Sequence, residues 1–231
     1  MPPNPTRTVE IIAHRGLHAT ARENTVEAFE LAIAAGAAAI ELDVHATRDG
    51  SIVVHHDPDI GDRPISIAGS DLKDVKAAAS KAGFVLPTLP EVLDAVAGKA
   101  RIYIEVKAQD IELLVARIVR KTDQAVAVHS FDHRVVRKIR DFAPAVETGI
   151  LTVSRPINPR RLLTDAKATD YWPQADFVDR ELVSDIHDAG GRVIVWTANR
   201  PAQWERLVGL QVDGICTDRP DELQEWIGRI I

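Results

Sequence analysis

Short apolar runs rich in β-branched residues alternate along this chain with segments whose apolar positions recur at helical spacing. This alternation is typical of parallel strands joined by right-handed helical crossovers. Strands are predicted over residues 9–14, 39–44, 101–106, 125–130, 148–153, 192–197 and 214–217, with a fainter strand over either 171–173 or 177–180. A total of about eight strands predicts an α/β fold of the (β/α)8 TIM-barrel type.

Helices are predicted between these strands, over residues 25–35, 111–121, 133–142, 180–189 and 201–208. Thr25 is a suitable N-cap for the first of them, and Pro90 and Pro201 stand where a first helical turn tolerates proline. The stretch from Pro58 to Pro87 is predicted to be an irregular excursion from the barrel after the second strand. A length of 231 residues suits one barrel, so a single domain over residues 1–231 is predicted.

Charged residues interrupt two of the predicted strands at alternate positions, as Glu41 with Asp43 and as Glu105 with Lys107. Residues two apart on a strand point to the same face, roughly 6.7 Å from each other. Burying several carboxylates costs free energy unless a cation or a proton compensates them. A divalent metal ion with oxygen ligands is the simplest compensation for both pairs. Glu105 has a second interpretation, in which it forms only an ion pair with Lys107.

Polar residues also gather where successive predicted strands end. His14 and Arg15 end the first strand, His129 ends the fourth, and Trp196 ends the seventh. The carboxyl ends of barrel strands are where TIM barrels carry their active sites, whereas a purely structural polar set would not favour one end. The pattern therefore predicts an active site at this end, with His129 as a residue of its wall.

The composition narrows the class of protein. A net charge of −6 and an isoelectric point near 5.8 argue against a partner such as nucleic acid, which is bound through a basic surface. The single cysteine, Cys216, lies in an apolar setting and is predicted to be buried filler. No apolar run is long enough to cross a bilayer and the first residues have no apolar signal region, so no membrane insertion and a cytoplasmic location are expected. The sequence gives no indication of the oligomeric state.

A series of short motifs carries a family resemblance over nearly the whole chain. In order they are HRG at 14–16, ENT at 23–25, ELDV at 41–44, TRDG at 47–50, VVHHD at 53–57, PTLPEVL at 87–93, IEVK at 104–107, and VWTAN followed by DGICTDRPD. Together they resemble the glycerophosphodiester phosphodiesterase family. The resemblance implies a metal-dependent TIM barrel that hydrolyses glycerophosphodiesters to glycerol 3-phosphate and an alcohol. It also implies a divalent cation, Mg²⁺ or Ca²⁺, and a small insertion over the active-site rim, here reduced to residues 58–86.

The resemblance also implies roles for individual residues, each carried by a motif of this sequence. The implied metal ligands are Glu41, Asp43 and Glu105, and the implied acid and base are His14 and His56. Phosphodiester cleavage needs positive charge on the nonbridging oxygens as well, which a metal, Arg15 and Lys107 can supply. Trp196 resembles the aromatic residue that lines the glycerol pocket.

Three points of chemistry stay open at this stage. The sequence does not assign base and acid between His14 and His56. It is equally compatible with direct attack by water and with attack by a glycerol hydroxyl that gives a cyclic intermediate. A barrel of the same superfamily that acts on a lysophospholipid or another phosphodiester is the alternative function.

Overall fold

A computed structural model describes residues 9–62 and 64–230 of the chain. Within these residues, eight parallel strands close into a ring in the order β1, β11, β10, β9, β8, β7, β6, β2, and β2 pairs in turn with β1. The strands are β1 (Glu10–His14), β2 (Ala39–Ala46), β6 (Arg101–Val106), β7 (Val126–Ser130), β8 (Glu147–Thr152), β9 (Asp170–Pro173), β10 (Arg192–Val195) and β11 (Gly214–Thr217). The predicted barrel is confirmed.

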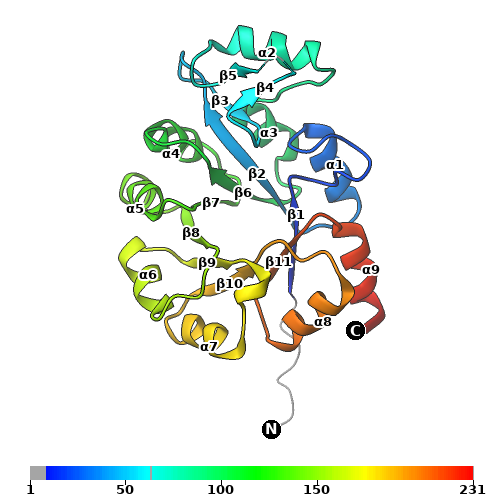
Figure 1. Cartoon of the computed structure of the whole chain (residues 1–231), viewed down its shortest axis with the longest axis vertical. Helices are drawn as coiled ribbons and strands as arrows, with labels where there is room; N and C mark the ends of the chain where they lie inside the picture. The colour runs from blue at the N-terminus through cyan, green and yellow to red at the C-terminus, as the bar shows by residue number, and fades with distance from the viewer. Residues whose placement is uncertain (1–8, 63, 231) are drawn as a thin grey trace.

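Helices surround the ring of strands, as Figure 1 shows. They are α1 (Val26–Ala34), α3 (Leu89–Val96), α4 (Glu112–Val119), α5 (His133–Phe142), α6 (Pro159–Ala166), α7 (Arg180–Asp188), α8 (Pro201–Gly209) and α9 (Pro220–Ile230). Capping sets several of their starts. The Thr25 hydroxyl accepts a hydrogen bond from the Ala28 amide, and Thr88 forms a capping box with Glu91 in front of Pro90. The five predicted helices are present within two residues of their expected bounds.

The sequence predicts two alternative segments for the sixth strand of the barrel, and the structure contains only the first. Residues 171–173 lie within β9, whereas the prediction for 177–180 is wrong. Phe177 ends a 3-10 helix, η1 (Ala175–Phe177), and Arg180 begins α7. The reason is the cap, because the Asp179 carboxylate accepts a hydrogen bond of 2.9 Å from the Leu182 amide and so starts a helix there.

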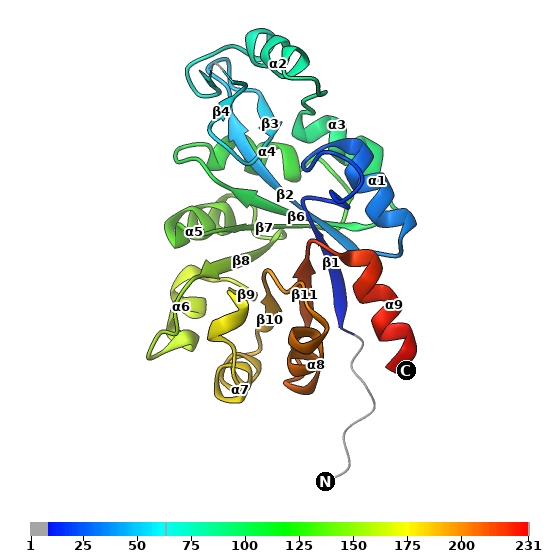
Figure 2. The same ribbon diagram turned by 45° about the vertical axis from the view of Figure 1, so that its right-hand side comes forward.

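The excursion after the second barrel strand is more regular than predicted. Beyond β2 the chain turns into the antiparallel strand β3 (Ile52–Val54), then forms the hairpin β4 (Asp59–Ile60) with β5 (Ile65–Ser66), and then α2 (Leu72–Lys81). These elements lie together at one side of the carboxyl end of β2 (Figures 1 and 2). They share an apolar cluster that consists of Val53, Ile60, Ile67, Val75, Ala79 and Leu86. Burial of this small core explains why the excursion forms regular strands and a helix. The core joins residues that are distant in sequence, so a local pattern does not reveal it.

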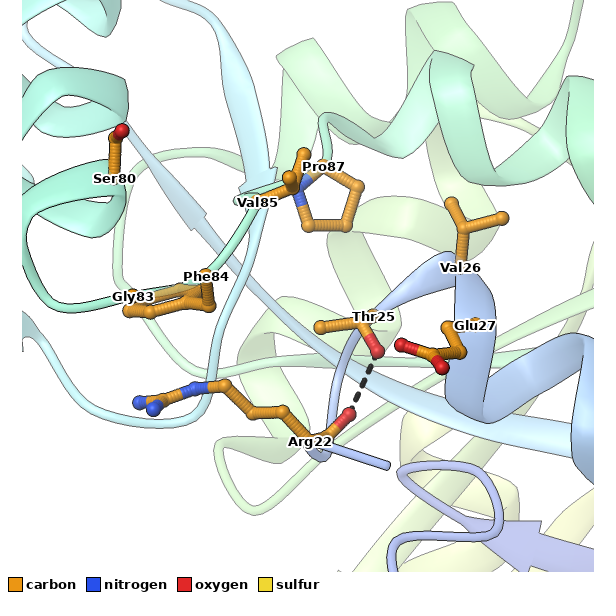
Figure 3. A pocket seen from close by; sticks show the side chains of 9 residues that line it. All are labelled: Arg22, Thr25, Val26, Glu27, Ser80, Gly83, Phe84, Val85 and Pro87. Carbon is orange, nitrogen blue, oxygen red and sulfur yellow. Dashed lines mark hydrogen bonds between the residues drawn. The ribbon is translucent and has the colours of Figure 1, made fainter. Parts of the chain in front are cut away.

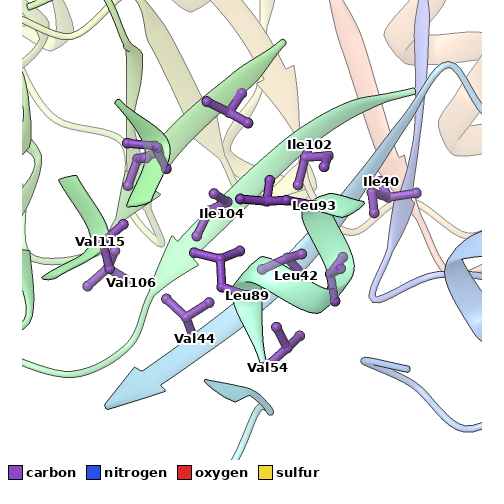
Figure 4. Close-up of a cluster of buried hydrophobic side chains, with 14 of the residues drawn as sticks. Ile40, Leu42, Val44, Val54, Leu89, Leu93, Ile102, Ile104, Val106 and Val115 are labelled. Carbon is purple, nitrogen blue, oxygen red and sulfur yellow. The ribbon is translucent and has the colours of Figure 1, made fainter. Parts of the chain in front are cut away.

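Alternation along the strands explains how apolar packing positions the polar residues. Ile40, Leu42 and Val44 of β2 are buried in a cluster with Leu89 and Leu93 of α3, outside the ring of strands (Figure 4). Because successive side chains point to opposite faces, the residues between them, Glu41 and Asp43, face the barrel interior. The same alternation in β6 places Ile104 and Val106 in the outer cluster and Glu105 inside. The apolar outer face therefore sets the inward direction of all three carboxylates.

Across residues 9–62 and 64–230, no helix combines the length and the apolarity that crossing a membrane requires. The expected location in the cytoplasm stays a prediction.

Candidate active site

A cavity of about 110 Å³ opens at the carboxyl end of the barrel. Its lining consists of His14, Arg15, Glu41, His56, Glu105, Lys107, His129, Phe131, Leu151, Trp172, Trp196 and Cys216. Seven of the eight residues predicted for the site are in this set. The eighth, Asp43, lies beside the lining and contacts two of its members, Arg15 at 3.1 Å and Lys107 at 3.6 Å.

The turn after β1 shapes one side of the cavity. Arg15 and Gly16 both have positive φ, 57° and 87°, which reverses the chain directly after His14. A Cβ atom at Gly16 would lie 2.6 Å from the Ala28 carbonyl carbon, so only glycine fits the approach to α1. The Arg15 amide donates to the Glu41 backbone oxygen at 2.9 Å and faces its carboxylate at 3.3 Å. The HRG motif thus bends the chain so that the Arg15 amide reaches both oxygen groups of Glu41 in β2.

The buried carboxylates differ in their partners. Asp43 accepts a hydrogen bond of 2.9 Å from the Asn24 side-chain amide and forms an ion pair with the Arg15 guanidinium. Burial and the charge of Glu41 raise the pKa of Asp43, and burial with the charges of Asp43 and Glu41 raises the pKa of Glu105. Burial acts in the same direction on Glu41, but the nearby imidazoles of His129, 3.7 Å away, and of His14 leave its pKa lowered. Negative charge at this point is therefore unfavourable for two of the three groups.

This arrangement fits a divalent cation. Glu41, Glu105 and His129 each offer a ligand atom, and these atoms all lie within 4.8 Å of one another. The Asp43 Oδ1 atom is buried and has no hydrogen-bond partner among the described residues. Convergent carboxylate oxygens are the donors that Mg²⁺ and Ca²⁺ prefer. Glu105 also contacts Lys107 at 3.1 Å, so both interpretations of Glu105 from its spacing have a geometric basis.

The two histidines of the predicted acid and base pair each carry a carboxylate partner. The Nδ1 atom of His14 lies 2.6 Å from the Asp218 carboxylate, and that of His56 lies 2.8 Å from Asp57. Burial alone lowers the pKa of His14, but the hydrogen bond to Asp218 and the charge of Glu41 outweigh it and raise that pKa. Because each Nδ1 atom is engaged by a carboxylate, the Nε2 atom is the one left for substrate.

Aromatic side chains form part of the cavity wall. Trp196 donates a hydrogen bond of 3.0 Å to the Trp172 backbone oxygen, and the Phe131 ring meets Trp196 edge-on with 5.3 Å between centroids. The His129 ring stacks on Trp172 at 4.4 Å. His129 is thus a wall residue, as predicted. Cys216 also lies in the lining, and burial raises the pKa of its thiol well above the usual range, as expected of a buried cysteine. Trp172 was missed because the strand that carries it has little sequence signal. Phe131 was missed although it directly follows β7, a strand that the sequence does predict.

A larger cavity of about 460 Å³ lies between the start of α1 and the loop that follows α2. Figure 3 shows its lining, with Arg22 extended toward Phe84. The Arg22 guanidinium carbon is 3.8 Å from the Phe84 ring centre, and His55 stacks on the same ring at 5.7 Å. The lining contains neither a histidine nor a pair of carboxylates. The smaller cavity is therefore the candidate active site, and His55 is not among the residues that line it.

Comparison with known families identifies the chain. The model of the glycerophosphoryl diester phosphodiesterase family matches residues 14–222. The chain belongs to this family. The predicted class of enzyme, a phosphoric diester hydrolase, is thereby confirmed, and named relatives agree with it. A glycerophosphodiester phosphodiesterase of Caldanaerobacter subterraneus subsp. tengcongensis is 31% identical over 92% of this chain and 95% of its own. One of Bacillus altitudinis is 32% identical over 92% and 95%.

Two solved structures share the barrel fold with this chain. A glycerophosphodiester phosphodiesterase of Thermotoga maritima superposes with a TM-score of 0.83 at 27% identity and covers 94% of this chain and 98% of its own. A phosphodiesterase of Oleispira antarctica, solved with the product sn-glycerol-3-phosphate, gives a TM-score of 0.87 at 24% identity over 95% and 96%. At 24% identity, the similarity to the Oleispira antarctica structure shows a shared fold alone.

Proposed function

We propose that this chain hydrolyses glycerophosphodiesters to glycerol 3-phosphate and an alcohol in the carboxyl-end cavity, with a divalent cation. One observation carries the proposal: three carboxylates, two cationic side chains and two carboxylate-paired histidines converge on one small cavity. This set supplies every group that phosphodiester hydrolysis requires. The named relatives, and the product in the Oleispira antarctica structure, support glycerophosphodiesters as the substrate class.

The metal would be held by Glu41, Asp43 and Glu105, with His129 near enough to be a further ligand. When bound, the cation neutralises charge on the nonbridging phosphate oxygens and orients the phosphate. Its charge would offset the burial and mutual repulsion that raise the pKa of Asp43 and Glu105. Mg²⁺ and Ca²⁺ both suit these oxygen donors, and the proposal covers either ion.

Two side chains bring positive charge to the phosphate. Arg15 and Lys107 both line the cavity, and each is held there by Asp43. The Arg15 guanidinium is also fixed by Glu23 at 3.2 Å. Arg15 offers a planar set of donors that matches phosphate oxygens, whereas Lys107 acts as a point charge. Both cations are thus positioned before substrate binds, which lowers the cost of reorganisation in the transition state.

The proton transfers are assigned to His14 and His56. The attacking hydroxyl loses a proton and the leaving alkoxide gains one, so two groups that titrate near neutrality are needed. Asp218 orients His14 through its Nδ1 atom and leaves Nε2 facing the cavity. Asp57 holds His56 in the same way. Trp196, together with Phe131, gives the glycerol portion an apolar wall.

The first experiment is a release assay. Protein stripped with EDTA is incubated with glycerophosphocholine or glycerophosphoethanolamine, and glycerol 3-phosphate is measured after Mg²⁺, Ca²⁺ or Mn²⁺ is restored. We expect release that requires metal and that falls by about 10²- to 10⁴-fold in His14→Ala, the usual contribution of an acid or base. His187→Ala is the matched control, because His187 also pairs with an aspartate, Asp213 at 2.8 Å, but away from the cavity. Folded protein that releases no product with any metal contradicts the proposal.

The lysophospholipid alternative is not favoured, because the named relatives in these comparisons are glycerophosphodiester phosphodiesterases. The same assay with a lysophospholipid as substrate gives the direct comparison.

A further inference from the structure

A second group of metal-ligating side chains lies behind His14, on the side away from the buried carboxylates. His18 follows in the loop between β1 and α1, and its Nε2 atom is 3.1 Å from the same Asp218 oxygen that His14 contacts at 2.6 Å. The ligand atoms of His14, His18 and Asp218 all lie within 4.8 Å of one another. The proposed reaction uses Asp218 only to orient His14, and it leaves His18 without a role.

The donor set differs in kind from the carboxylate group around Glu41. Two imidazoles and one carboxylate are the ligands of open zinc sites, in which a fourth position is left for water. The three side chains are 19%, 27% and 30% exposed, so an ion can enter from solvent.

The neighbours of Asp218 favour the same use. The Asn199 side-chain amide donates to the Oδ2 atom of Asp218 at 2.6 Å, and the Asp218 backbone amide donates to the Asn199 side-chain oxygen at 2.9 Å. These bonds fix the carboxylate while its Oδ1 atom points at both histidines. A ligand held by an outer hydrogen bond in this way is a regular feature of metal sites.

We propose that His14, His18 and Asp218 bind a transition-metal ion of the zinc type, and that this ion inhibits the enzyme. The Nδ1 atom of His14, the Nε2 atom of His18 and a carboxylate oxygen donate electron pairs to the ion, and any proton on those atoms is released to solvent. The inhibition, though not the binding, rests on the function proposed above. Ligation of the His14 Nδ1 atom and of Asp218 replaces the 2.6 Å contact between them, which orients His14 for the proposed proton transfer.

Binding is tested without substrate. Co²⁺ replaces Zn²⁺ as the probe, because its visible absorption reports imidazole ligation, and excess Mg²⁺ fills the carboxylate group around Glu41. We expect a saturable visible band in the unsubstituted protein and in His187→Ala, and loss of the band in His18→Ala. His187 is the matched control because its side chain is 27% exposed, like that of His18, and also pairs with one aspartate. A band that survives in His18→Ala, or no band in the unsubstituted protein, overturns the site.

Inhibition is tested in the release assay with Mg²⁺ in excess, and each rate is expressed relative to the same variant without zinc. Loss of an outer partner of a metal ligand lowers affinity about 10- to 100-fold, so removal of a ligand should raise the zinc concentration for half-inhibition in His18→Ala at least about tenfold. His187→Ala should match the unsubstituted protein. Equal inhibition of all three proteins overturns the inhibitory role, while the absorption result decides the site independently of activity.

Discussion

Charged side chains cluster at both ends of this barrel, in the same proportion of acids to bases. Around the carboxyl-end cavity the carboxyl-end group consists of Glu41, Asp43, Glu105, Arg15 and Lys107. At the other end five strands begin with a charged residue, and this amino-end group consists of Glu10, Glu147, Asp170, Arg101 and Arg192. Each group has three carboxylates and two cations, so charge balance alone does not distinguish a site from a structural network.

The amino-end group spreads its charge over shared guanidinium groups. Arg192 forms ion pairs with Glu10, with Glu147 at 3.8 Å and with Asp170 at 3.8 Å. The Tyr103 hydroxyl donates to Glu10 at 2.8 Å. A planar guanidinium can serve several carboxylates at once, which suits a network with a structural role.

In the carboxyl-end group both cations contact Asp43, and Lys107 also contacts Glu105 at 3.1 Å. Glu41 pairs instead with the imidazole of His129 at 3.7 Å. Glu41 and Glu105 are left facing the same cavity. The comparison teaches that function is marked by carboxylates that converge on open space. Carboxylates that are distributed among arginines mark a structural role.

The largest effect on this comparison is expected from Glu105→Gln. We expect activity to fall about 10³-fold, the scale for loss of a group that stabilises developing charge. In EDTA, the thermal midpoint should stay equal or rise, because the substitution removes one of three repelling carboxylates. Activity and thermal unfolding are measured on the same preparation. Glu147→Gln, the matched change at the amino end, should keep its activity, and the comparison fails if the two variants behave alike.

Arg192→Met tests whether the amino-end group has a structural role, because it removes a cation instead of a carboxylate. It leaves Glu10 and Asp170 without their shared cation, and removal of one partner of a buried ion pair costs about 4 kcal/mol. We expect the free energy of unfolding in denaturant to fall by about that amount, while kcat of the folded protein is unchanged. A loss of kcat without a loss of stability would show that this end takes part in catalysis.

The pH dependence of stability gives a third test, through Asp170. Burial raises the pKa of Asp170 to about 6, although Arg192 and Arg101 oppose that rise. The pKa of Asp170 in the folded protein exceeds the ordinary value of 3.8. The contribution of Asp170 to the free energy of unfolding is therefore fully present below pH 3.8 and is lost as pH rises through 6. The advantage of the unsubstituted protein over Asp170→Asn should therefore shrink by about 3 kcal/mol between pH 3 and pH 7. Parallel denaturation profiles for the two proteins over this range would contradict it.

The smallest of the four effects is expected from Asp218→Asn. Loss of the carboxylate that orients His14 should lower kcat about 10²-fold, as a misplaced reacting group does, with little change in KM. Asp218→Glu, which restores a carboxylate, should recover part of the rate. Steady-state kinetics provide the measurement, and an effect confined to KM would assign Asp218 to substrate binding instead.

The sequence by itself determined the barrel, the inward direction of the carboxylates and the end at which they meet. These follow from local periods, because apolar residues at alternate positions of β2 and β6 leave Glu41, Asp43 and Glu105 only one face. The HRG turn is local as well, since the close approach to α1 requires Gly16. Strand signals fail where a cap competes with them, as at Asp179.

Only the tertiary structure decided which distant residues meet. Closure of the ring brings β11 beside β1, so Asp218 reaches His14 across 204 positions of the sequence, and Arg192 reaches Tyr103 across 89. It also brings His129 to Glu41 and Trp196 to Trp172. Such pairings depend on the order and register of all eight strands, which no local period encodes. The partners that orient His14, and the difference between the two charged ends, are for that reason properties of the closed barrel.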